Sequence, residues 1–451
     1  MVYIIKKDGT KEEFDANKIK RAVNKSAGRV MYRFTDDEIN FICKYATDRA
    51  EAMSRERKGG KIMIQDMHNI VEGALEQVNP AVAKSYRDYR NYKVDFIHMM
   101  DEVYTKSQSI RYIGDKSNAN TDSALVATKR SLIFNELNKE LYRKFFMNRN
   151  ELQACKDGYI YIHDQSARLD TMNCCLFDVG SVLRGGFEMG NVWYNEPKTL
   201  DTAFDVMGDI ILSTAAQQYG GFTVPEVDKI LSPYAQKSYN KYYEEFLKYS
   251  DPSWEGREEK GRVYAWEKVC RDCDQGWQGI EYKLNTVGSS RGDYPFVTVT
   301  LGLGTGRFEK MISKSLLKVH MGGQGKAGHK KPVLFPKIVF LYDEEIHGDG
   351  KECEDVFETG VACSAKTMYP DWLSMSGQGY ISSMYKKYKK VISPMGCRAF
   401  LSPWYERGGM EPADENDVPV FVGRFNIGAV SLHLPMILAK ARAENTDFYE
   451  V

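Results

Sequence analysis

Two short apolar runs constrain the fold of this chain more than any other feature of its sequence. The runs PFVTVTLG and PKIVFLY occupy residues 295–302 and 336–342. Continuous strands of this type are typical of a parallel sheet that is covered on both faces. From residue 124 onward such strands alternate with amphipathic helices. The sequence therefore predicts an α/β domain.

The helical pattern is clearest over residues 198–221, which read KTLDTAFDVMGDIILSTAAQQYGG. Apolar side chains recur there at helical spacing, and two glycines end the segment. The predicted buried stripe consists of Leu200, Ala203, Phe204, Met207 and Ile211.

The first 95 residues have a different character. VYIIKK and TKEEF are predicted to form a hairpin around Asp8-Gly9. Asp15 is placed to cap a following helix with Ile19 and Val23 on its apolar face. Three more helices are expected, within residues 36–53, 64–78 and 81–104. We therefore expect a small domain at 1–95, a polar linker or arm at 96–123, and the α/β domain at 124–451.

The overall composition excludes several classes of protein. The 451 residues carry 62 basic and 62 acidic side chains, which argues against a nucleic-acid partner or a charged membrane surface. No apolar run is long enough to span a membrane, and the start MVYIIKKDG lacks the apolar core of a signal peptide. The 9 cysteines form no disulfide framework. A cytoplasmic location is expected.

Three motifs resemble known binding sites but do not meet their sequence patterns. The loop GLGTGRF at 302–308 fails the dinucleotide-binding spacing, and GGQGKAGHKK at 322–331 fails the P-loop pattern. Both are interpreted as glycine loops near a ligand or at strand ends. Cys270 and Cys273 form a C-x-x-C pair without a second pair, which argues against a zinc site and leaves a redox role open. Two ordinary thiols in a surface helix or loop are expected.

Lysines near the N-terminus have two interpretations. Lys6 and Lys7 precede a turn, and Lys18 lies in the first turn of the next helix. Ammonium groups beside a helix N-terminus can bind phosphate. The residues alone favour the other interpretation, a solvated basic edge.

Four stretches place sulfur or polar groups at the ends of apolar strands: YIHD, NCCL, MGCRAF and GRFNIGAVSLHLP, which begin at residues 161, 173, 395 and 423. Strand ends are where α/β and barrel enzymes place their chemistry. A single buried cysteine is more often packing than catalysis. Together the four stretches predict a catalytic site.

These stretches resemble the anaerobic (class III) ribonucleoside-triphosphate reductases, which are glycyl-radical enzymes, over nearly the whole chain. The segment VYIIKKDGTKEEFDANKIKRAV resembles the ATP-cone, a module that senses ATP against dATP. The body is similar at NANTDS, NEPKTL, QQYGG, PFVTVT and MYPD, and above all at SPMGCRAFLSPW and GRFNIGAVSLHLP. The resemblance implies an ATP-cone followed by most of a ten-stranded α/β barrel.

The resemblance also implies the catalytic groups. Cys397, in the finger loop MGCR, corresponds to the thiyl radical that takes a ribose 3′ hydrogen. Cys174 corresponds to the thiol that protonates the leaving 2′ hydroxyl, with Cys175 as its packing neighbour. Asn426 corresponds to an asparagine that hydrogen-bonds the sugar. The substrate would be a ribonucleoside triphosphate.

Met395 corresponds to the branch of the family that uses formate as reductant. His163 is expected either to help form the formate pocket or to be a satisfied histidine behind it.

Two regulatory sites follow from the same resemblance. ATP or dATP would bind the cone through Lys6, Lys7, Lys18 and His68, and dATP would switch activity off. A second dNTP would set specificity at a dimer interface that includes the segment from Lys198 to Asp209, unless that helix only packs a dimer. The expected partners are a second copy, or a higher oligomer, and a radical-SAM activase.

The family's zinc-binding C-x-x-C pairs and its C-terminal radical glycine do not occur before Val451. The chain is therefore expected to be a truncated or split reductase. The alternative is a catalytically inactive, nucleotide-sensing regulatory fragment. A glycyl-radical lyase is a weaker rival, because adjacent catalytic cysteines would be expected in its finger loop and Cys397 stands alone there.

Overall fold

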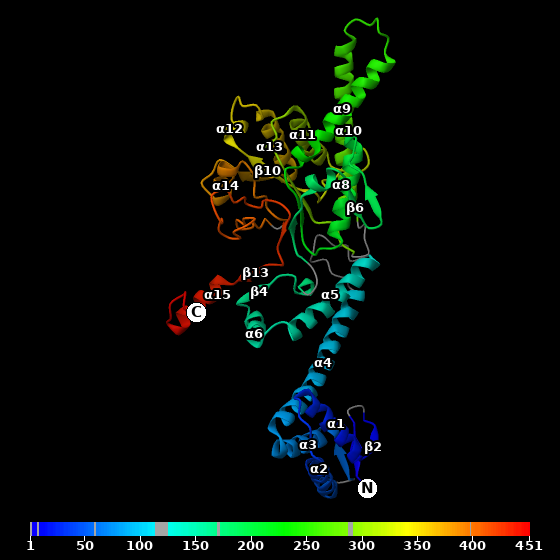
Figure 1. Cartoon of the computed structure of the whole chain (residues 1–451), viewed down its shortest axis with the longest axis vertical. Helices are drawn as coiled ribbons and strands as arrows, with labels where there is room; N and C mark the ends of the chain where they lie inside the picture. Colours follow the sequence, from blue (N-terminus) through cyan, green and yellow to red (C-terminus); the bar gives the residue numbers. More distant parts are fainter. Residues whose placement is uncertain are drawn as a thin grey trace. The chain divides into compact units, whose positions relative to one another are not determined.

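The structure is a computed structural model that describes residues 2–6, 9–57, 60–112, 125–168, 172–286, 292–396 and 398–451. By the contacts within the chain, these residues divide into two units, Met1–Thr105 and Lys106–Val451 (Figure 1). Each unit has its own hydrophobic core.

The first unit contains the predicted hairpin and helices. Strand β1 (Tyr3–Ile5) pairs antiparallel with β2 (Lys11–Glu13), which confirms the hairpin. A third strand, β3 (Lys61–Met63), pairs parallel with β1 and was not predicted, because its three residues follow a basic glycine loop. The helices of this unit are α1 (Ala16–Arg29), α2 (Asp36–Glu56), α3 (Ile64–Val78) and the first part of α4 (Pro80–Tyr112).

Local capping explains where these helices begin. The side chain of Asp15 accepts a hydrogen bond from the Asn17 N–H at 2.8 Å, which confirms the predicted cap of α1. Thr35 and Glu38 form a capping box at the start of α2. Ile19 and Val23 of α1 are buried in the core of this unit, as their spacing predicts.

Helix α4 runs through much of the predicted linker. Residues 96–112 continue this helix, and Met99 and Val103 are buried on it. The remaining residues of the predicted linker, 113–123, lie outside the described residues.

The second unit is built on a six-stranded sheet in the order β11-β10-β9-β8-β5-β12. Neighbouring strands from β11 to β5 are parallel, and β12 is antiparallel to β5. Their bounds are β5 (Cys175–Leu176), β8 (Phe222–Val224), β9 (Val297–Leu301), β10 (Lys337–Tyr342), β11 (Asp371–Ser374) and β12 (Arg424–Phe425). The predicted α/β class with a parallel sheet is confirmed, whereas closure into a ten-stranded barrel stays a prediction.

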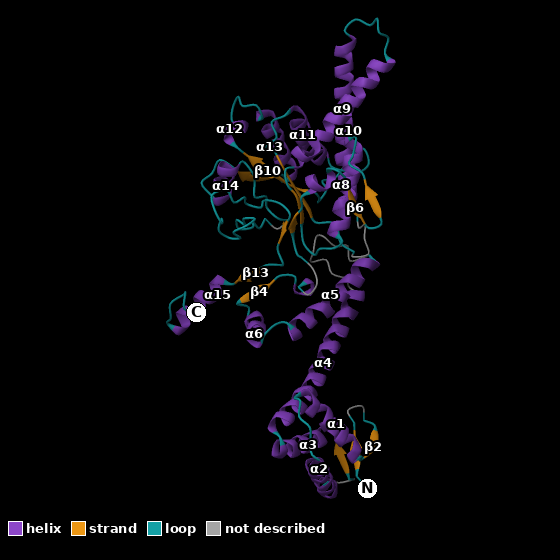
Figure 2. Cartoon of the chain, viewed as in Figure 1, coloured by secondary structure: helices purple, strands orange, loops and turns teal. Residues whose placement is uncertain are grey.

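Helices pack against one face of this sheet (Figures 1 and 2). They include α8 (Leu200–Ala215), α9 (Val227–Tyr249), α10 (Arg257–Leu284), α11 (Arg307–Gly322) and α13 (Glu354–Thr367). All five members of the predicted stripe on α8 are buried in this core.

The other elements of the second unit are short or peripheral. The helices are the rest of α4, α5 (Val126–Phe145), α6 (Arg149–Asp157), η1 (Gln165–Ala167), α7 (Val179–Leu183), α12 (Glu344–His347), α14 (Tyr380–Tyr388) and α15 (Leu434–Glu444). Two small antiparallel pairs join β4 (Ile160–Ile162) to β13 (Val430–Leu432) and β6 (Phe187–Met189) to β7 (Val192–Tyr194).

Strand β9 has two chemically different faces. Val297, Val299 and Leu301 pack in the core beneath the helices. Thr298 and Thr300 are fully buried on the alternate positions, and their hydroxyls contact the segment 393–398. The run VTVTL therefore places hydroxyl groups under the finger loop and apolar groups under the helices.

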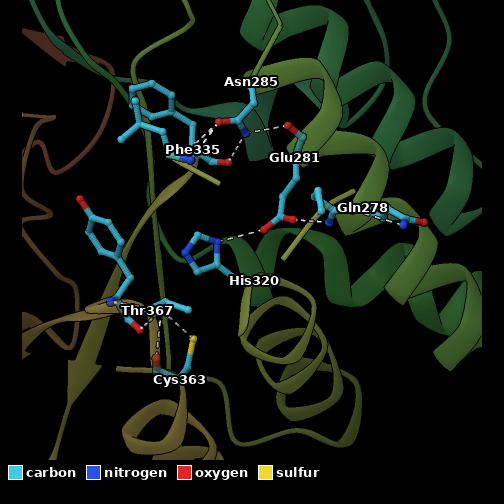
Figure 3. A network of polar contacts seen from close by, with 10 residues as sticks. Gln278, Glu281, Asn285, His320, Phe335, Cys363 and Thr367 are labelled. Atoms are coloured by element: carbon cyan, nitrogen blue, oxygen red, sulfur yellow. Dashed lines mark hydrogen bonds and ion pairs between the residues drawn. The ribbon is translucent and has the colours of Figure 1, made fainter. Parts of the chain in front are cut away.

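A buried polar network ties α10, α11 and the start of β10 together (Figure 3). Glu281 accepts from Gln324 Nε2 at 2.5 Å, and its other oxygen lies 3.0 Å from His320 Nδ1. Asn285 bonds both the N–H and the carbonyl of Phe335. The Phe335 ring packs edge-on against Phe296, with centroids 5.3 Å apart. The network therefore fixes the strand ends that support the cavity described below.

In the part of the chain that the structure describes, no helix has the length and hydropathy needed to cross a membrane.

Candidate functional site

A cavity of about 760 Å³ opens at the strand ends of the second unit. Its wall includes α5, the segment 216–221, the loop after β4 and the turn before Ala399. All four predicted stretches contribute lining residues, among them His163, Cys174, Arg398 and Ala429. The sequence-based grouping of these stretches around one cavity agrees with this arrangement.

The two adjacent cysteines differ in their surroundings. Cys174 lies in the cavity wall. Cys175 points into the helix-side core, and its thiol donates to Gln218 Oε1 at 2.9 Å. Burial raises the pKa of Cys175 to about 12, so this thiol keeps its proton. Of the two, only Cys174 is placed to meet a ligand in the cavity.

Asn426 holds the strand that carries Cys174. Its Oδ1 accepts from the Cys174 N–H at 2.9 Å, and its own N–H donates to the Cys174 carbonyl at 3.0 Å. The Asn426 carbonyl accepts from the Asn173 N–H at 2.9 Å. The predicted sugar-binding asparagine therefore lies beside the predicted proton donor and fixes its main chain.

The finger loop forms a tight turn from Met395 to Arg398. The Arg398 N–H donates to the Met395 carbonyl at 2.7 Å, and the Met395 N–H donates to the Ala399 carbonyl at 2.8 Å. Cys397 itself lies outside the described residues. Its two neighbours in the chain are both placed, and they locate the turn.

Two glycines bring this turn against the strand end next to Cys174. A Cβ atom on Gly221 would lie 2.7 Å from the Gly396 Cα, which leaves no room for a side chain at either position. A Cβ on Gly396 would also strike the Phe296 ring at 2.7 Å. The Gly221 N–H donates to Cys174 Sγ at 3.2 Å. The residue before Cys397 thus touches the residue that holds the Cys174 thiol.

Arg398 anchors the turn on the other side. It adopts a left-handed backbone with φ of 65°, and its guanidinium binds Asp371 at the start of β11. The same guanidinium reaches Thr298 Oγ1 at 3.4 Å. The hydroxyl of Thr223 donates to the Pro394 carbonyl at 3.1 Å. Side chains from three strands therefore hold the finger loop.

Met395 and His163 have different positions around the cavity. Met395 is 1% exposed and packs with Cys174 and Leu176 behind the cavity wall. His163 lines the cavity, and its Nε2 lies 2.8 Å from Ser431 Oγ. His163 is therefore both a cavity residue and a partnered one, and its role in a formate pocket stays a prediction.

The glycine loop at 302–308 is filled from within the protein. Asp228 is fully buried, and its Oδ2 accepts from the N–H groups of Gly302 and Gly304 at 3.1 and 3.3 Å and from Ser313 Oγ at 3.2 Å. Burial raises the pKa of Asp228 to about 6. An internal carboxylate therefore occupies the place that an external anion would take, and the loop is at the end of β9 as predicted.

Cys270 and Cys273 lie on a helix, α10, as predicted, but the predicted surface position is wrong for Cys273, because this residue faces the core beneath the helices. Cys273 is fully buried, and burial raises the pKa of both thiols. Among the described residues, no group of three or more His, Cys, Asp and Glu side chains is arranged to hold a metal ion.

The first unit has a separate cavity of about 840 Å³. It is lined by the cations Lys18, Arg21, Lys25, Arg29 and Arg90, by His68, and by the aromatic residues Tyr86, Tyr89 and Phe96, among others. His68 Nδ1 lies 2.9 Å from the Tyr86 hydroxyl, and burial raises the pKa of Tyr86 to about 12. Cations and aromatic rings around a cavity of this size suit a nucleotide.

The predicted lysines of the cone differ in position. Lys18 lines the cavity, and Lys6 does not belong to the lining residues. Both form ion pairs with Glu12, with Lys6 Nζ at 2.6 Å from its carboxylate. Lys7 lies outside the described residues. Glu12 therefore connects the hairpin to the cationic face of α1.

Sequence reasoning missed most of this cationic face. Lys18, Arg21, Lys25 and Arg29 are spaced by three, four and four residues, which places them on one side of a helix. That spacing was a usable signal. The sequence contains no comparable signal for Arg90 of α4, because its place beside the cavity depends on how α4 packs against α1.

The predicted specificity segment is less clearly defined. Lys198 is exposed and precedes α8. Asp209 is half-buried on α8, where it accepts from the Tyr194 hydroxyl at 3.5 Å. The dNTP site at this segment stays a prediction.

Comparison with known proteins agrees with this two-unit arrangement. The family model described as anaerobic ribonucleoside-triphosphate reductase matches residues 117–451, and the ATP cone domain matches residues 2–94. An anaerobic ribonucleoside-triphosphate reductase from Haemophilus influenzae is 32% identical over 99% of this chain and 60% of its own length. The corresponding protein of Enterobacteria phage T4 is 36% identical over 71% of this chain and 50% of its own.

About a quarter of this chain also resembles part of a different protein. The transcriptional repressor NrdR of Thermotoga neapolitana is 30% identical over 23% of this chain and 64% of its own length. The chain spans about 60% of the length of the curated reductases from Haemophilus influenzae and Escherichia coli. On the match over residues 117–451, the chain belongs to the anaerobic ribonucleoside-triphosphate reductase family and carries an ATP cone domain at its N-terminal end.

Proposed function

We propose that this chain forms the nucleotide-binding, thiol-bearing part of an enzyme that reduces ribonucleoside triphosphates to 2′-deoxyribonucleoside triphosphates. The contact between Gly396 and Gly221 supports this most directly, because Gly221 holds the Cys174 thiol in the cavity wall. Two separate chain segments that carry cysteines thereby converge on one cavity.

In the proposed reaction, a thiyl radical on Cys397 takes the hydrogen atom from ribose C3′. The family's glycyl radical, expected outside this chain, would supply the unpaired electron. Cys174 then gives a proton to the 2′ hydroxyl, which leaves as water. A thiol can do so only when its sulfur lies against the sugar, which a tight turn and a fixed strand end both favour. The side-chain NH₂ of Asn426 is proposed to donate to a sugar oxygen, and the hydrogen bond from the Cys174 N–H to Asn426 Oδ1 supports this role.

Formate is the proposed reductant. Oxidation of formate to carbon dioxide releases the two electrons that loss of the hydroxyl consumes. The balanced change is one ribonucleoside triphosphate, one formate and one proton to one deoxyribonucleoside triphosphate, one carbon dioxide and one water. Met395 packs behind Cys174, and His163 lies in the cavity wall, so both are near the place where formate would act.

The cone cavity is the proposed site for ATP or dATP. Five cations line it, and triphosphates carry several negative charges. Aromatic rings such as Tyr89 can stack on a base. We further propose a second, specificity-setting dNTP site along the segment from Lys198 to Asp209, a homodimer or higher oligomer, activation by a radical-SAM enzyme, and a cytoplasmic location.

The experiment that tests this function compares the activated full-length protein with its Cys397→Ala variant. Wild-type protein is expected to form deoxyribonucleotides when formate is present. The variant is expected to form none while its ATP binding is unchanged. Deoxyribonucleotide formation by the variant above background would contradict the assignment of Cys397.

A second candidate function is nucleotide sensing without catalysis. The cationic cavity favours it, since all of the lining residues of this cavity lie within the first unit and none of them belongs to the cavity that holds Cys174. ATP binding without any nucleotide reduction in the activated full-length protein would favour this candidate. Reduction would exclude it.

A further inference from the structure

One polar group in the wall of the catalytic cavity has no partner. Asn173 precedes Cys174, lines the cavity and is only 6% exposed. Its side-chain Oδ1 is buried, and it accepts no hydrogen bond from any described residue. Buried carbonyl oxygens in native proteins nearly always accept a bond. A donor outside the described residues, such as a ligand in the cavity, is therefore expected at this oxygen.

The main chain of Asn173 is already satisfied on both sides. Its N–H donates to the Asn426 carbonyl at 2.9 Å, and its carbonyl accepts from the Gly220 N–H at 2.6 Å. These bonds fix the backbone from which the side chain projects. The oxygen without a partner therefore belongs to a residue whose main chain is fixed at the strand end.

Gly220 leaves the space that this oxygen occupies. A Cβ atom at Gly220 would lie 2.2 Å from Asn173 Oδ1 and 2.7 Å from Cys174 Sγ. Any larger residue there would displace both groups. The amide oxygen and the thiol therefore share one small space, which only glycine keeps open.

The chemistry of the oxygen limits what it can bind. A carbonyl oxygen accepts hydrogen bonds and does not donate them. The triphosphate of a nucleotide offers acceptors and negative charge, so it is excluded as the partner. The ribose offers two donors, its 2′ and 3′ hydroxyls. Both belong to the part of the substrate that reacts beside Cys174.

We propose that Asn173 is a substrate-binding residue whose Oδ1 accepts a hydrogen bond from a ribose hydroxyl of the ribonucleoside triphosphate. This inference rests on the proposed reduction of that substrate class. A site built to bond a hydroxyl discriminates against analogues that lack it. Asn173 thereby favours the ribonucleotide over an analogue that lacks the bonded hydroxyl.

The test uses the activated full-length enzyme with CTP as substrate and 2′-deoxy-CTP and 3′-deoxy-CTP as competing ligands. Asn173→Ala is expected to raise the KM for CTP about tenfold to hundredfold, the effect of losing one buried hydrogen bond. For the analogue that lacks the bonded hydroxyl, the inhibition constant of the variant is expected to stay within about twofold of the wild-type value. Neither enzyme can form the hydrogen bond with that analogue. The analogue whose inhibition constant changes least on Asn173→Ala substitution lacks the hydroxyl that Asn173 binds.

Asn173→Asp is the matched variant, since it keeps an acceptor oxygen of the same shape. It is expected to retain the wild-type preference for CTP over the analogue whose inhibition constant Asn173→Ala changes least, and thermal melting confirms that both variants fold. Equal weakening of all three ligands by Asn173→Ala, or no weakening of any, would overturn the inference. If wild-type enzyme forms no deoxyribonucleotide at all, the proposed function fails, which is a separate result.

Discussion

At the scale of single residues, adjacent positions in this chain have opposite environments. Cys174 lies in a cavity wall and Cys175 in the core, although the sequence gives both the same neighbours. The side chains of consecutive strand residues point to opposite faces, which accounts for the difference. Motif similarity predicted which cysteine is exposed to the cavity. It could not predict that Asn426, 252 positions away, would bond the Cys174 main chain.

The cysteine pair gives the first prediction. Cys174→Ala is expected to lower nucleotide reduction at least about a hundredfold, because a positioned proton donor contributes on that order. Cys175→Ala is expected to lower stability by about 1 kcal/mol, as for a typical buried substitution, with reduction largely retained. Steady-state kinetics and thermal melting separate the two effects. Equal losses of activity in both variants would contradict the assignment.

Asp228 gives a prediction about pH. Burial raises its pKa to about 6 from 3.8, so the folded protein prefers the protonated carboxyl. Its contribution to stability is therefore complete below about pH 4 and is lost as the pH rises through about 6. A shift of about two units corresponds to about 3 kcal/mol.

Melting curves recorded between pH 4 and 7 check this. Asp228→Asn keeps an oxygen for the glycine loop and does not ionise, so its stability is expected to change less across this range than that of wild-type protein. Parallel pH profiles for the two proteins would contradict the role of Asp228.

At the scale of elements, buried polar contacts join helices that the sequence treats as independent. The segments of α10 and α11 carry Glu281 and His320, both essentially unexposed, which form the centre of the network in Figure 3. Sequence periodicity predicted α8 and the strands β9 and β10. It did not predict this pairing, since charged residues on buried helix faces break the pattern on which such predictions depend.

Glu281→Ala is expected to destabilise the second unit by about 3 to 5 kcal/mol, because it leaves a buried histidine and a half-buried glutamine without their acceptor. The matched control is Glu258→Ala on the same helix. Glu258 pairs with Arg262 at 3.2 Å, but their side chains are 72% and 51% exposed. The control is expected to cost less than about 0.5 kcal/mol. Urea denaturation of both variants tests the difference, and similar midpoints would contradict it.

Helix α1 gives a binding prediction. Lys18→Ala is expected to weaken ATP and dATP binding about tenfold, as loss of a charge-assisted contact typically does. Lys20→Ala is the control, because Lys20 is exposed on the same helix and does not line the cone cavity. Titration calorimetry on the full chain compares the two variants. If Lys18→Ala binds ATP and dATP as tightly as Lys20→Ala does, Lys18 is not part of the site.

At the scale of the whole molecule, fold class and grouping of the site were predictable, and several details were not. The apolar strands predicted the parallel sheet, and the four motifs predicted a site to which Cys174 and His163 contribute cavity residues. The position of Cys397 and the roles of these residues stay predictions. The three-residue strand β3 was too short to show a pattern. Asp228 filling the glycine loop could not be foreseen, because it joins residues 74 positions apart. Contacts of this kind depend on packing and leave no local signal.

The central claim is that the finger loop brings Cys397 to the cavity wall beside Cys174. The most direct test treats the unactivated chain with a short thiol-specific cross-linker, followed by tryptic digestion and mass spectrometry. Cys174 lies in the tryptic peptide 169–184 and Cys397 in 391–398. The account predicts a cross-link between these two peptides that disappears in Cys174→Ser and in Cys397→Ser. A cross-link that survives Cys174→Ser, or modification of the two thiols without any cross-link, would contradict it.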